Sequence, residues 1–576
     1  MKTNSYVSRV KILAIILLLI MALFVVRLFW LQVIQHEEYA QAAKNSQQRN
    51  FTIPAERGQI YMKDGSDESV PVVLNQIVYS VIADPVVVKA NEKDKIIKVL
   101  EDVAGGEVLG NLADRLGNQK SRYEVLAKNI TRSQAEKIKS EEFSGILLQR
   151  NSIRNYPEGS LGAQVLGFVN ADGAGQYGVE GSLNDRLKGQ DGILRTVTDV
   201  RDIPLTVGKD NIRVEAKAGE DITLTVDRNI QSFTEEALKS GVEKAGATEG
   251  SAVVMNPNSG EVLAMANFPT YNPSEFSKVE NASVFMNATT MLPYEPASVI
   301  KPFLIATAID KGAITADSTY INTDCIQVQD RSMCNTLRGL GGVTTVQEIL
   351  NNSLNVGTIT MARRLGNGSN IDLGARQTIY DYYHDKFGLG AKTGFELGDV
   401  AGNIFTPDST EGNEVRYSSM TYGQGLTVTT LQVVSGFSAL VNGGDYYQPT
   451  IIASQSPTDK PKPIRRTISQ DTSREIRQML VEARGSAWFG KNDWQGYLIG
   501  GKTGTAESVI DGVYTREETV ATYVGFGGQD TPEYVIMVHV AAPGKKLNLE
   551  GGLHASPIFA EISNKMIDYL KIPPRR

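Results

Sequence analysis

The sequence predicts a multidomain α/β protein that is held at a membrane by a single N-terminal helix. Three observations support this prediction. An apolar segment near the N-terminus is long enough to cross a bilayer, and the 576 residues exceed what one hydrophobic core usually encloses. After the apolar segment, strand-like and helix-like patterns are interleaved along the chain. We therefore expect a membrane anchor followed by at least two folded domains.

The anchor is predicted from an apolar run that extends from Ile12 to Ile34 and is interrupted only by polar Arg27 and Gln32. At about 1.5 Å per residue, this run crosses a bilayer core of roughly 30 Å. Basic residues precede the run and acidic residues follow it, so the positive-inside rule places residues 1–11 in the cytoplasm and the chain after about residue 35 outside. A cleaved signal peptide is the alternative, although no small-residue cleavage site closes the run.

Composition excludes several classes of function. The formal net charge is -7 and the sequence contains no block of basic residues, which argues against a nucleic-acid partner. The four histidines lack the spacing of metal ligands, so we do not expect zinc catalysis. They are His36, His384, His539 and His554.

The two cysteines, Cys325 and Cys334, enclose a short turn-like segment in the part of the chain expected outside the cytoplasm. Since that compartment is oxidising, we predict that a disulfide joins them across a hairpin. Two free buried thiols are the alternative.

Changes of pattern divide the exported part into two domains. Residues 35–217 mix strand-like pieces such as VVLNQIVYSVI with helix-like pieces such as NEKDKIIKVLEDV. In residues 218–576 the strand DITLTVD is followed by a helix that Asp227 can cap, and SAVVM and EVLAMA flank a hairpin turn. TVATYVGFG and YVIMVHVAA predict two more strands, and PIFAEISNKMIDYL predicts a closing helix. This order predicts helices packed around a mainly antiparallel sheet.

A candidate nucleophile lies in EPASVIKPF, where Ser298 precedes Lys301 by three residues. If a helix begins here, the two side chains share one face, so a neutral amine can take the proton of the hydroxyl. The lysine needs a lowered pKa for this role, which burial and a second cation would both provide. The pattern is weak alone, because Ser8 and Lys11 repeat it in the predicted cytoplasmic tail.

The triplet Lys-Thr-Gly occurs twice, at Lys392 and at Lys502. The second copy follows YLIGG, precedes small residues and leads toward two predicted strands, as an edge strand that binds a peptide requires. The first copy lies among glycines that predict a helix end and a loop. We therefore assign Lys502 to the site and Lys392 to a surface loop.

Ser298-x-x-Lys301, Ser353-Leu354-Asn355 and Lys502-Thr503-Gly504 occur in the order typical of penicillin-binding proteins and related β-lactamases. The chain resembles the class B penicillin-binding proteins, which are monofunctional peptidoglycan D,D-transpeptidases, over almost its whole length. Further landmarks are PAERGQIY, RNYPEGSLGAQVLGFV, YGVEGSLNDRLKGQDG and YGQGLTVTTLQ. The middle residue of the second motif, Leu354, departs from the Ser-Asp-Asn form, but the serine and asparagine that carry the family chemistry are present.

The resemblance implies a pedestal (dimerisation-like) domain at residues 35–217 and a transpeptidase domain with the serine β-lactamase-like fold at 218–576. Ser298 would attack the penultimate D-Ala carbonyl of a stem peptide, and Lys301 would accept its proton. The backbone N–H groups of Ser298 and Thr505 would form the oxyanion hole. The remaining implied site residues are Ser353 and Asn355 (catalytic), Lys502 (catalytic), and Thr503, Gly504 and Thr505 (substrate-binding).

The implied ligands are D-Ala-D-Ala stem peptides and β-lactam antibiotics. The implied mechanism needs neither a metal nor an organic cofactor. The implied partners are a lipid-II polymerase of the shape, elongation, division and sporulation family and other membrane proteins of the division machinery. The ending DYLKIPP and the stretch MANFPTYNPSEF resemble the septal type. An elongation-type transpeptidase of the lateral wall is the alternative, and a penicillin-sensing module or a β-lactamase is a remoter one.

Overall fold

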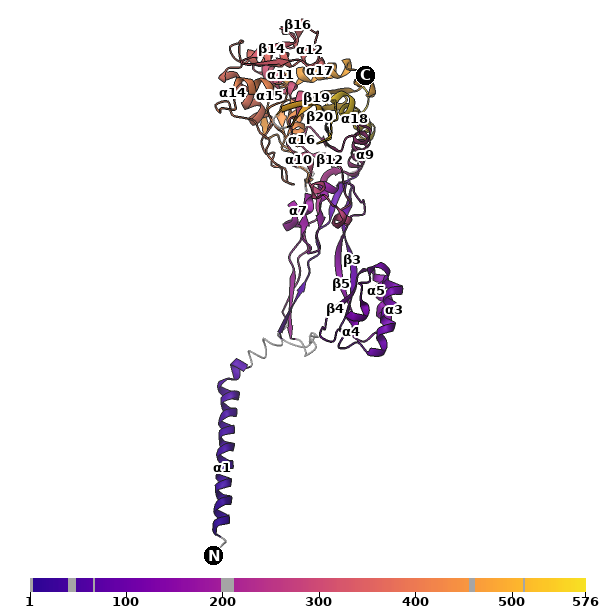
Figure 1. Cartoon of the computed structure of the whole chain (residues 1–576), viewed down its shortest axis with the longest axis vertical. Coiled ribbons are helices and arrows are strands. Elements are labelled where there is room, and N and C mark those ends of the chain that lie inside the picture. Colours follow the sequence, from indigo (N-terminus) through magenta and orange to yellow (C-terminus); the bar gives the residue numbers. More distant parts are fainter. Residues whose placement is uncertain are drawn as a thin grey trace. The chain divides into compact units, whose positions relative to one another are not determined.

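A long apolar helix begins the chain (Figure 1). The computed structural model describes residues 4–39, 48–65, 68–197, 212–454, 461–510 and 513–575. Helix α1 (Asn4–Phe29) continues into a short π-helical turn, η1 (Trp30–Ile34). Within the described residues, Arg9–Ile34 is the one segment long and apolar enough to cross a membrane. Together, α1 and η1 contain the whole apolar run, Ile12 to Ile34, that was predicted as the anchor.

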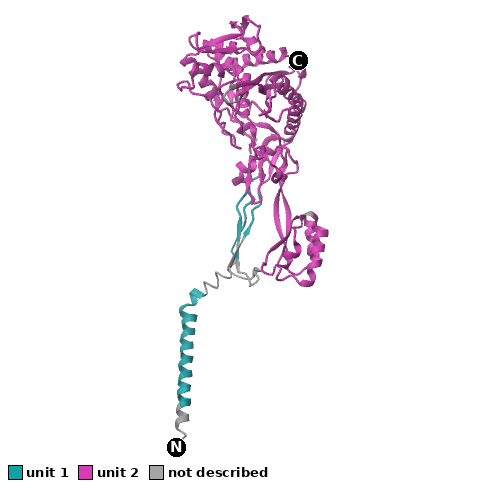
Figure 2. Cartoon of the chain, in the orientation of Figure 1, with its two compact units in different colours: residues 1–57, 188–220 teal, residues 58–187, 221–576 magenta. Residues whose placement is uncertain are grey.

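The chain divides into two compact units (Figure 2), which are described separately. The first comprises residues 1–57 and 188–220, and the second comprises residues 58–187 and 221–576. Besides α1, the first unit contains an antiparallel sheet in which β8 is the middle strand. Its strands are β1 (Gln48–Ile53), β8 (Gly192–Val197) and β9 (Ile212–Val214).

The N-terminal part of the second unit is built around a second sheet, in which strand order is β10-β2-β3-β4 and β5 also pairs with β3. The strands are β10 (Ile222–Asp227), β2 (Ile60–Lys63), β3 (Ser69–Ala83), β4 (Glu124–Ile130) and β5 (Ile146–Asn155). The helices α3 (Lys93–Ala104), α4 (Leu112–Gly117) and α5 (Arg132–Ser140) accompany it. Their apolar side chains share one hydrophobic core with those of β3 and β4. This core includes Leu100 of α3, Leu126 of β4 and Ile138 of α5.

Short elements follow β5 along the chain. They are α6 (Ala163–Leu166), β6 (Phe168–Val169), β7 (Gly175–Gln176), α7 (Gly178–Ser182) and α8 (Asn184–Leu187). Arg154 at the end of β5 forms a buried ion pair with Glu180 of α7, with 2.6 Å between Nε and Oε1. Because a buried guanidinium needs partners, this pair ties α7 to the sheet.

The third sheet carries the candidate site. Its strand order is β12-β11-β21-β20-β19, and every neighbouring pair is antiparallel. The strands are β11 (Glu249–Met255), β12 (Val262–Phe268), β19 (Leu498–Ile510), β20 (Val513–Gly528) and β21 (Pro532–Ala541). The predicted hairpin between SAVVM and EVLAMA and the two predicted C-terminal strands are therefore confirmed.

Helices cover both faces of this sheet because its strands are apolar on both sides. On β11, Val253 and Met255 belong to the core under α16, whereas Ala252 and Val254 belong to the core under α9 and α18. This alternation is the two-residue period of a strand. The covering helices are α9 (Arg228–Lys244), α16 (Thr430–Val441), α17 (Gln470–Ser486) and α18 (Ser556–Tyr569), and α11 (Lys301–Asp310) packs against α16 and α17. Asp227 caps α9 through the N–H groups of Asn229 and Ile230, as predicted.

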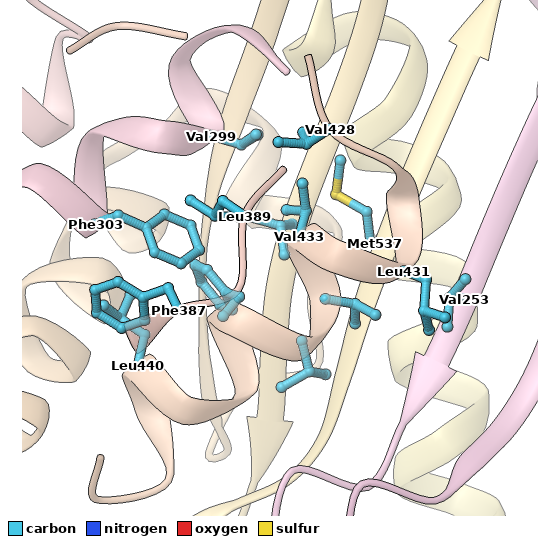
Figure 3. Close-up of a cluster of buried hydrophobic side chains, with 14 of the residues drawn as sticks. Val253, Val299, Phe303, Phe387, Leu389, Val428, Leu431, Val433, Leu440 and Met537 are labelled. Carbon is cyan, nitrogen blue, oxygen red and sulfur yellow. The ribbon is translucent and has the colours of Figure 1, made fainter. Parts of the chain in front are cut away.

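Figure 3 shows part of the larger core, where Phe303 of α11 faces Phe387 and Leu440. The rings of Phe303 and Phe387 are 5.0 Å apart and nearly perpendicular. Val299 and Val428 lie in the same core. The segment that carries the candidate nucleophile is therefore anchored by apolar packing on its inner side.

This region also contains further helices and strands. The helices are η4 (Pro273–Lys278), η5 (Ala282–Phe285), α10 (Ala288–Met291), η6 (Ala297–Ile300), α12 (Val346–Asn351), α13 (Asn355–Arg364), α14 (Leu373–Tyr380), η7 (Asp381–Lys386), α15 (Glu414–Met420), η8 (Trp488–Asn492) and η9 (Gly551–Ala555). The strands are β13 (Thr319–Asn322), β14 (Cys325–Val328), β15 (Arg331–Cys334), β16 (Gly342–Thr345), β17 (Asp445–Tyr446) and β18 (Arg465–Arg466).

Candidate active site

Ser298 lies in a tight turn rather than in the first turn of an α-helix. It belongs to the 3₁₀ segment η6, and α11 begins only at Lys301. The N–H of Lys301 donates to the carbonyl of Ser298, which is the 3₁₀ pattern. Pro302 comes next and has no N–H to donate to the same carbonyl, so the α-helical bond cannot form. Ser298 still precedes Lys301 by one turn, as the sequence predicted.

The turn is held in an unusual backbone conformation. Ala297 has φ of 57°, a value that costs energy for any residue with a side chain. Its N–H donates to the carbonyl of Gly423 at 3.0 Å, and a Cβ on Gly423 would lie 1.9 Å from the carbonyl oxygen of Ala297. A glycine is therefore required at 423. Ala297 and Val299 are buried while Ser298 between them is partly exposed, so the turn presents the serine to the surface.

Lys301 is completely buried, with 0% of its surface exposed. Its Nζ donates to the carbonyl of Ser353 at 2.5 Å, to Oγ of Ser353 at 3.1 Å and to Oδ1 of Asn355 at 2.8 Å. In the described part of the chain, no hydrogen bond joins Nζ to Ser298 Oγ. Burial lowers the pKa of Lys301 well below its ordinary value, and the charge of Lys502 lowers it further.

Ser353 and Asn355 are presented by the link between α12 and α13. Ser353 has φ of 54°, the left-handed conformation, and Asn355 is the first residue of α13. The Asn355 amide is oriented by two groups, because Oδ1 faces the lysine donor and Nδ2 donates to the carbonyl of Cys334 at 3.0 Å. Both polar residues of the second motif therefore accept hydrogen bonds from Lys301.

Lys502, Thr503, Gly504 and Thr505 lie on β19, which is the edge strand of the third sheet. Lys502 is 4% exposed, and its Nζ donates to Oγ1 of Thr503 at 3.2 Å. Burial lowers the pKa of Lys502 to about 7. Thr505 is exposed, and its Oγ1 accepts a hydrogen bond from the N–H of Gly551.

Gly504 is the point at which β19 touches the serine turn. A Cβ at this position would lie 2.8 Å from the carbonyl oxygen of Pro296 and 3.2 Å from Val299. Thr522 on the neighbouring strand donates to the same carbonyl at 3.2 Å. The third motif is thus packed directly against the turn that carries Ser298. Lys392, in contrast, lies exposed in a loop, as predicted.

Sequence reasoning missed a set of contacts that position the turn. Glu295 Oε1 accepts hydrogen bonds from the N–H of Gly425 at 2.8 Å and from Tyr514 Oη at 2.9 Å. Gly423 and Gly425 both lie in the stretch YGQGLTVTTLQ, a family landmark for which the sequence alone predicts no structural role. The two glycines in that stretch were the available signal.

Cys325 and Cys334 face each other as cross-strand partners on β14 and β15, and their sulfur atoms are bonded. The hairpin between them turns through Gln329 and Asp330. Within the described residues, no group of three or more His, Cys, Asp or Glu side chains is arranged to hold a metal ion.

Two family models match the chain. The model described as penicillin binding protein transpeptidase domain matches residues 250–564, and the model described as penicillin-binding protein dimerisation domain matches residues 52–224. Since the first covers more than half of the chain, the protein belongs to the penicillin-binding protein transpeptidase family. The presence of both domains confirms the prediction that the chain is a class B penicillin-binding protein. It also confirms the predicted class of enzyme, a transpeptidase.

Individual relatives agree with this assignment. Stage V sporulation protein D of Bacillus subtilis (strain 168) is 29% identical and aligns with 100% of this chain and 88% of its own length. Peptidoglycan D,D-transpeptidase FtsI of Escherichia coli (strain K12) is 28% identical, with coverage of 97% and 91%.

Among solved structures, penicillin binding protein 2X of Streptococcus thermophilus has a TM-score of 0.75 at 23% identity. The alignment covers 91% of this chain and 81% of that one, and it supports the predicted fold class. Apo penicillin binding protein 3 of Mycobacterium tuberculosis has a TM-score of 0.66 at 25% identity, with coverage of 91% and 98%.

Proposed function

We propose that this chain is a peptidoglycan D,D-transpeptidase that cross-links stem peptides during septal wall synthesis, with Ser298 as the nucleophile. The observation that supports this best is the fully buried amine of Lys301, one turn after Ser298 and in contact with Ser353 and Asn355. A neutral amine at this place can take a proton from the serine hydroxyl, which an exposed lysine at neutral pH cannot do.

In the first half-reaction, Ser298 Oγ attacks the carbonyl carbon of the penultimate D-Ala, and its proton passes to Lys301. The backbone N–H groups of Ser298 and Thr505 stabilise the oxyanion. When the peptide bond breaks, the departing D-Ala amine takes a proton that Ser353 relays from Lys301. An ester between Ser298 and the stem peptide remains.

In the second half-reaction, the amine of a neighbouring stem peptide attacks the ester and loses a proton, and Ser298 recovers its hydroxyl. Earlier, in the first half-reaction and before D-Ala departs, the hydroxyls of Thr503 and Thr505 bind the terminal carboxylate of the donor, and Lys502 supplies positive charge. Asn355 positions Lys301 and the peptide. Gly504 allows the edge strand to reach the serine turn, so the donor peptide can lie along β19.

Intact-mass analysis of the full-length chain in detergent after exposure to benzylpenicillin tests the nucleophile. We expect one adduct, which peptide mapping places on the peptide containing Ser298. Ser298→Ala should abolish the adduct while leaving the melting temperature unchanged, because one hydroxyl leaves almost no cavity. An adduct on any other peptide would contradict the assignment. The adduct should persist for many minutes, whereas a β-lactamase would release it.

We also propose the domain division and the setting. Residues 1–11 form a cytoplasmic tail, 12–34 the transmembrane helix, 35–217 the pedestal and 218–576 the transpeptidase domain, so catalysis takes place outside the cytoplasm. Division-type membrane proteins and a lipid-II polymerase are the proposed partners.

A role in the lateral wall is the second candidate for the same chemistry. Depletion of the protein in its host separates the two roles. Filamentous cells would support the septal role, and round cells would support the lateral role.

A further inference from the structure

Helix α13 begins at Asn355 without a cap of its own. The residue at its N-cap position is Leu354, which is fully buried and offers no side-chain acceptor to the first N–H groups of the helix. Elsewhere in the chain, Asp227, Thr345 and Asn413 fill this position in α9, α12 and α15 with side-chain oxygens that accept such bonds. The helix that presents the catalytic asparagine therefore needs an acceptor from another segment.

Asn335, at the end of hairpin β14–β15, supplies that acceptor. Its Oδ1 accepts the N–H of Val356, the second residue of α13, at 2.9 Å. The preceding residue, Cys334, accepts the Asn355 amide on its carbonyl at 3.0 Å. Two consecutive residues of the hairpin segment thus bind two consecutive residues at the start of the helix.

Burial and hydrogen bonds hold the backbone and the side-chain amide of Asn335 in place. It is 2% exposed, its N–H donates to the carbonyl of Asp324 at 2.7 Å, and its Nδ2 donates to Oδ1 of Asn322 at 2.9 Å. Asn322 in turn donates to the carbonyl of Leu340 at 2.9 Å. The chain of bonds begins at a backbone N–H and ends at a backbone carbonyl, so each amide has one orientation.

We propose that Asn335 is a positioning residue for the transpeptidase reaction: it caps α13 from outside the helix and thereby holds the Asn355 amide against Lys301. The proposal rests on the proposed function, because it assumes that Lys301 accepts the proton of Ser298. Since Asn355 Oδ1 is one of the three acceptors around Lys301 Nζ, loss of the cap moves an acceptor away from the amine. A charged ammonium loses more from this change than a neutral amine does.

The test is the pH profile of acylation by benzylpenicillin, measured as the second-order rate constant on the full-length chain in detergent. Asn335→Ala should lower the maximal rate constant by about tenfold. It should also move the acid limb of the profile to lower pH by about one unit, because loss of an acceptor for a charged donor destabilises protonated Lys301. Asn355→Ala should move the limb in the same direction.

Asn413→Ala is the matched control, since it removes an asparagine cap from α15, whose Arg416 N–H it accepts at 3.0 Å. It should lower the melting temperature without moving the limb. If Asn335→Ala behaves like Asn413→Ala, the positioning role is wrong. Should Asn335→Ala fail to fold, Asn322→Ala replaces it, because this variant frees the Asn335 amide to rotate. A limb unchanged in Asn322→Ala would equally overturn the proposal.

Ser298→Ala separates this inference from the proposed function. If Ser298→Ala is still acylated, the proposed function fails and the inference fails with it. If Ser298→Ala is inert and Asn355→Ala shifts the limb, but Asn335→Ala and Asn322→Ala do not, only the positioning role fails.

Discussion

Nζ of Lys301 lies 2.8 Å from Oδ1 of Asn355, in a place where no part of the lysine reaches solvent. With the carbonyl and the hydroxyl of Ser353, this oxygen completes three acceptors, which is the number of donors that an ammonium group carries. The acceptors favour the charged form, whereas burial and Lys502 oppose it. The protonation of Lys301 is therefore set by its surroundings and should be visible in the kinetics.

The first prediction concerns pH. The second-order rate constant of acylation should depend on pH in a bell-shaped manner, because this constant reports ionisations of the free enzyme. On the acid side it falls as Lys301, whose pKa is lowered by burial, becomes protonated and can no longer accept the proton of Ser298. On the alkaline side it falls as Lys502, with a pKa of about 7, loses the charge that attracts the carboxylate. Stopped-flow acylation across the pH range in which the protein stays folded measures both limbs.

Lys502→Ala provides the control for this profile. The alkaline limb should disappear, because the group that titrates there is absent. The acid limb should move to higher pH, since the positive charge that lowers the pKa of Lys301 has been removed. A profile with both limbs unchanged in Lys502→Ala would show that other groups produce them.

The second prediction compares the two Lys-Thr-Gly lysines at one pH. Lys502→Ala should slow acylation by on the order of a hundredfold, equivalent to about 2.7 kcal/mol of transition-state stabilisation. Lys392→Ala, on an exposed loop, should change the rate by less than about threefold and the free energy of unfolding by at most about 0.5 kcal/mol. The opposite result would transfer the site to the first triplet.

Much of this site could be predicted from the sequence, because local patterns determine it. The spacing of Ser298 and Lys301 sets one turn between them whether the turn is α or 3₁₀. The small residues after Lys502 and the apolar strands that follow it are local signals of an edge strand in a sheet. The pairing of Cys325 with Cys334 also follows from their short separation.

Other features could not be predicted, because they depend on contacts between distant segments. Ala297 and Ser353 adopt φ values of 57° and 54° that no propensity favours for alanine or serine. Neighbours far along the chain impose them, such as Gly423 on Ala297. The partnership of Asn335 with Val356 has the same origin. Nothing in the letters around either residue indicates the other.

The third prediction concerns the cysteines. Alkylation of the unfolded, unreduced protein should label neither Cys325 nor Cys334, and labelling after reduction should mark both. In the chain-entropy model, so short a loop contributes about 2 to 3 kcal/mol to the free energy of unfolding. Reduction, or the double change Cys325→Ser with Cys334→Ser, should therefore lower the melting temperature of the full-length chain. Labelling of both residues without reductant would rule the disulfide out in solution.

The last prediction tests the contact between the edge strand and the serine turn. In Gly504→Ala, the new methyl group would lie 2.2 Å from Oγ1 of Thr522 and 2.8 Å from the carbonyl oxygen of Pro296, and the second of these is backbone. Strand β19 must then move away from Ser298. We expect a loss of stability of about 1 to 3 kcal/mol from overpacking. Acylation should slow by about a hundredfold, because a displacement of about 1 Å in a reacting geometry can have that effect.

Gly485→Ala is the matched control for Gly504→Ala. Gly485 lies within α17, and a Cβ there would meet no atom within 4 Å. Alanine favours a helix over glycine by up to about 1 kcal/mol, so this variant should melt at an equal or higher temperature and be acylated at the normal rate. Normal acylation of Gly504→Ala would mean that the strand can leave the turn without harm to the reaction. The close approach of Gly504 to Pro296 would then be a packing feature only, and the placement of the donor peptide along β19 would need another support.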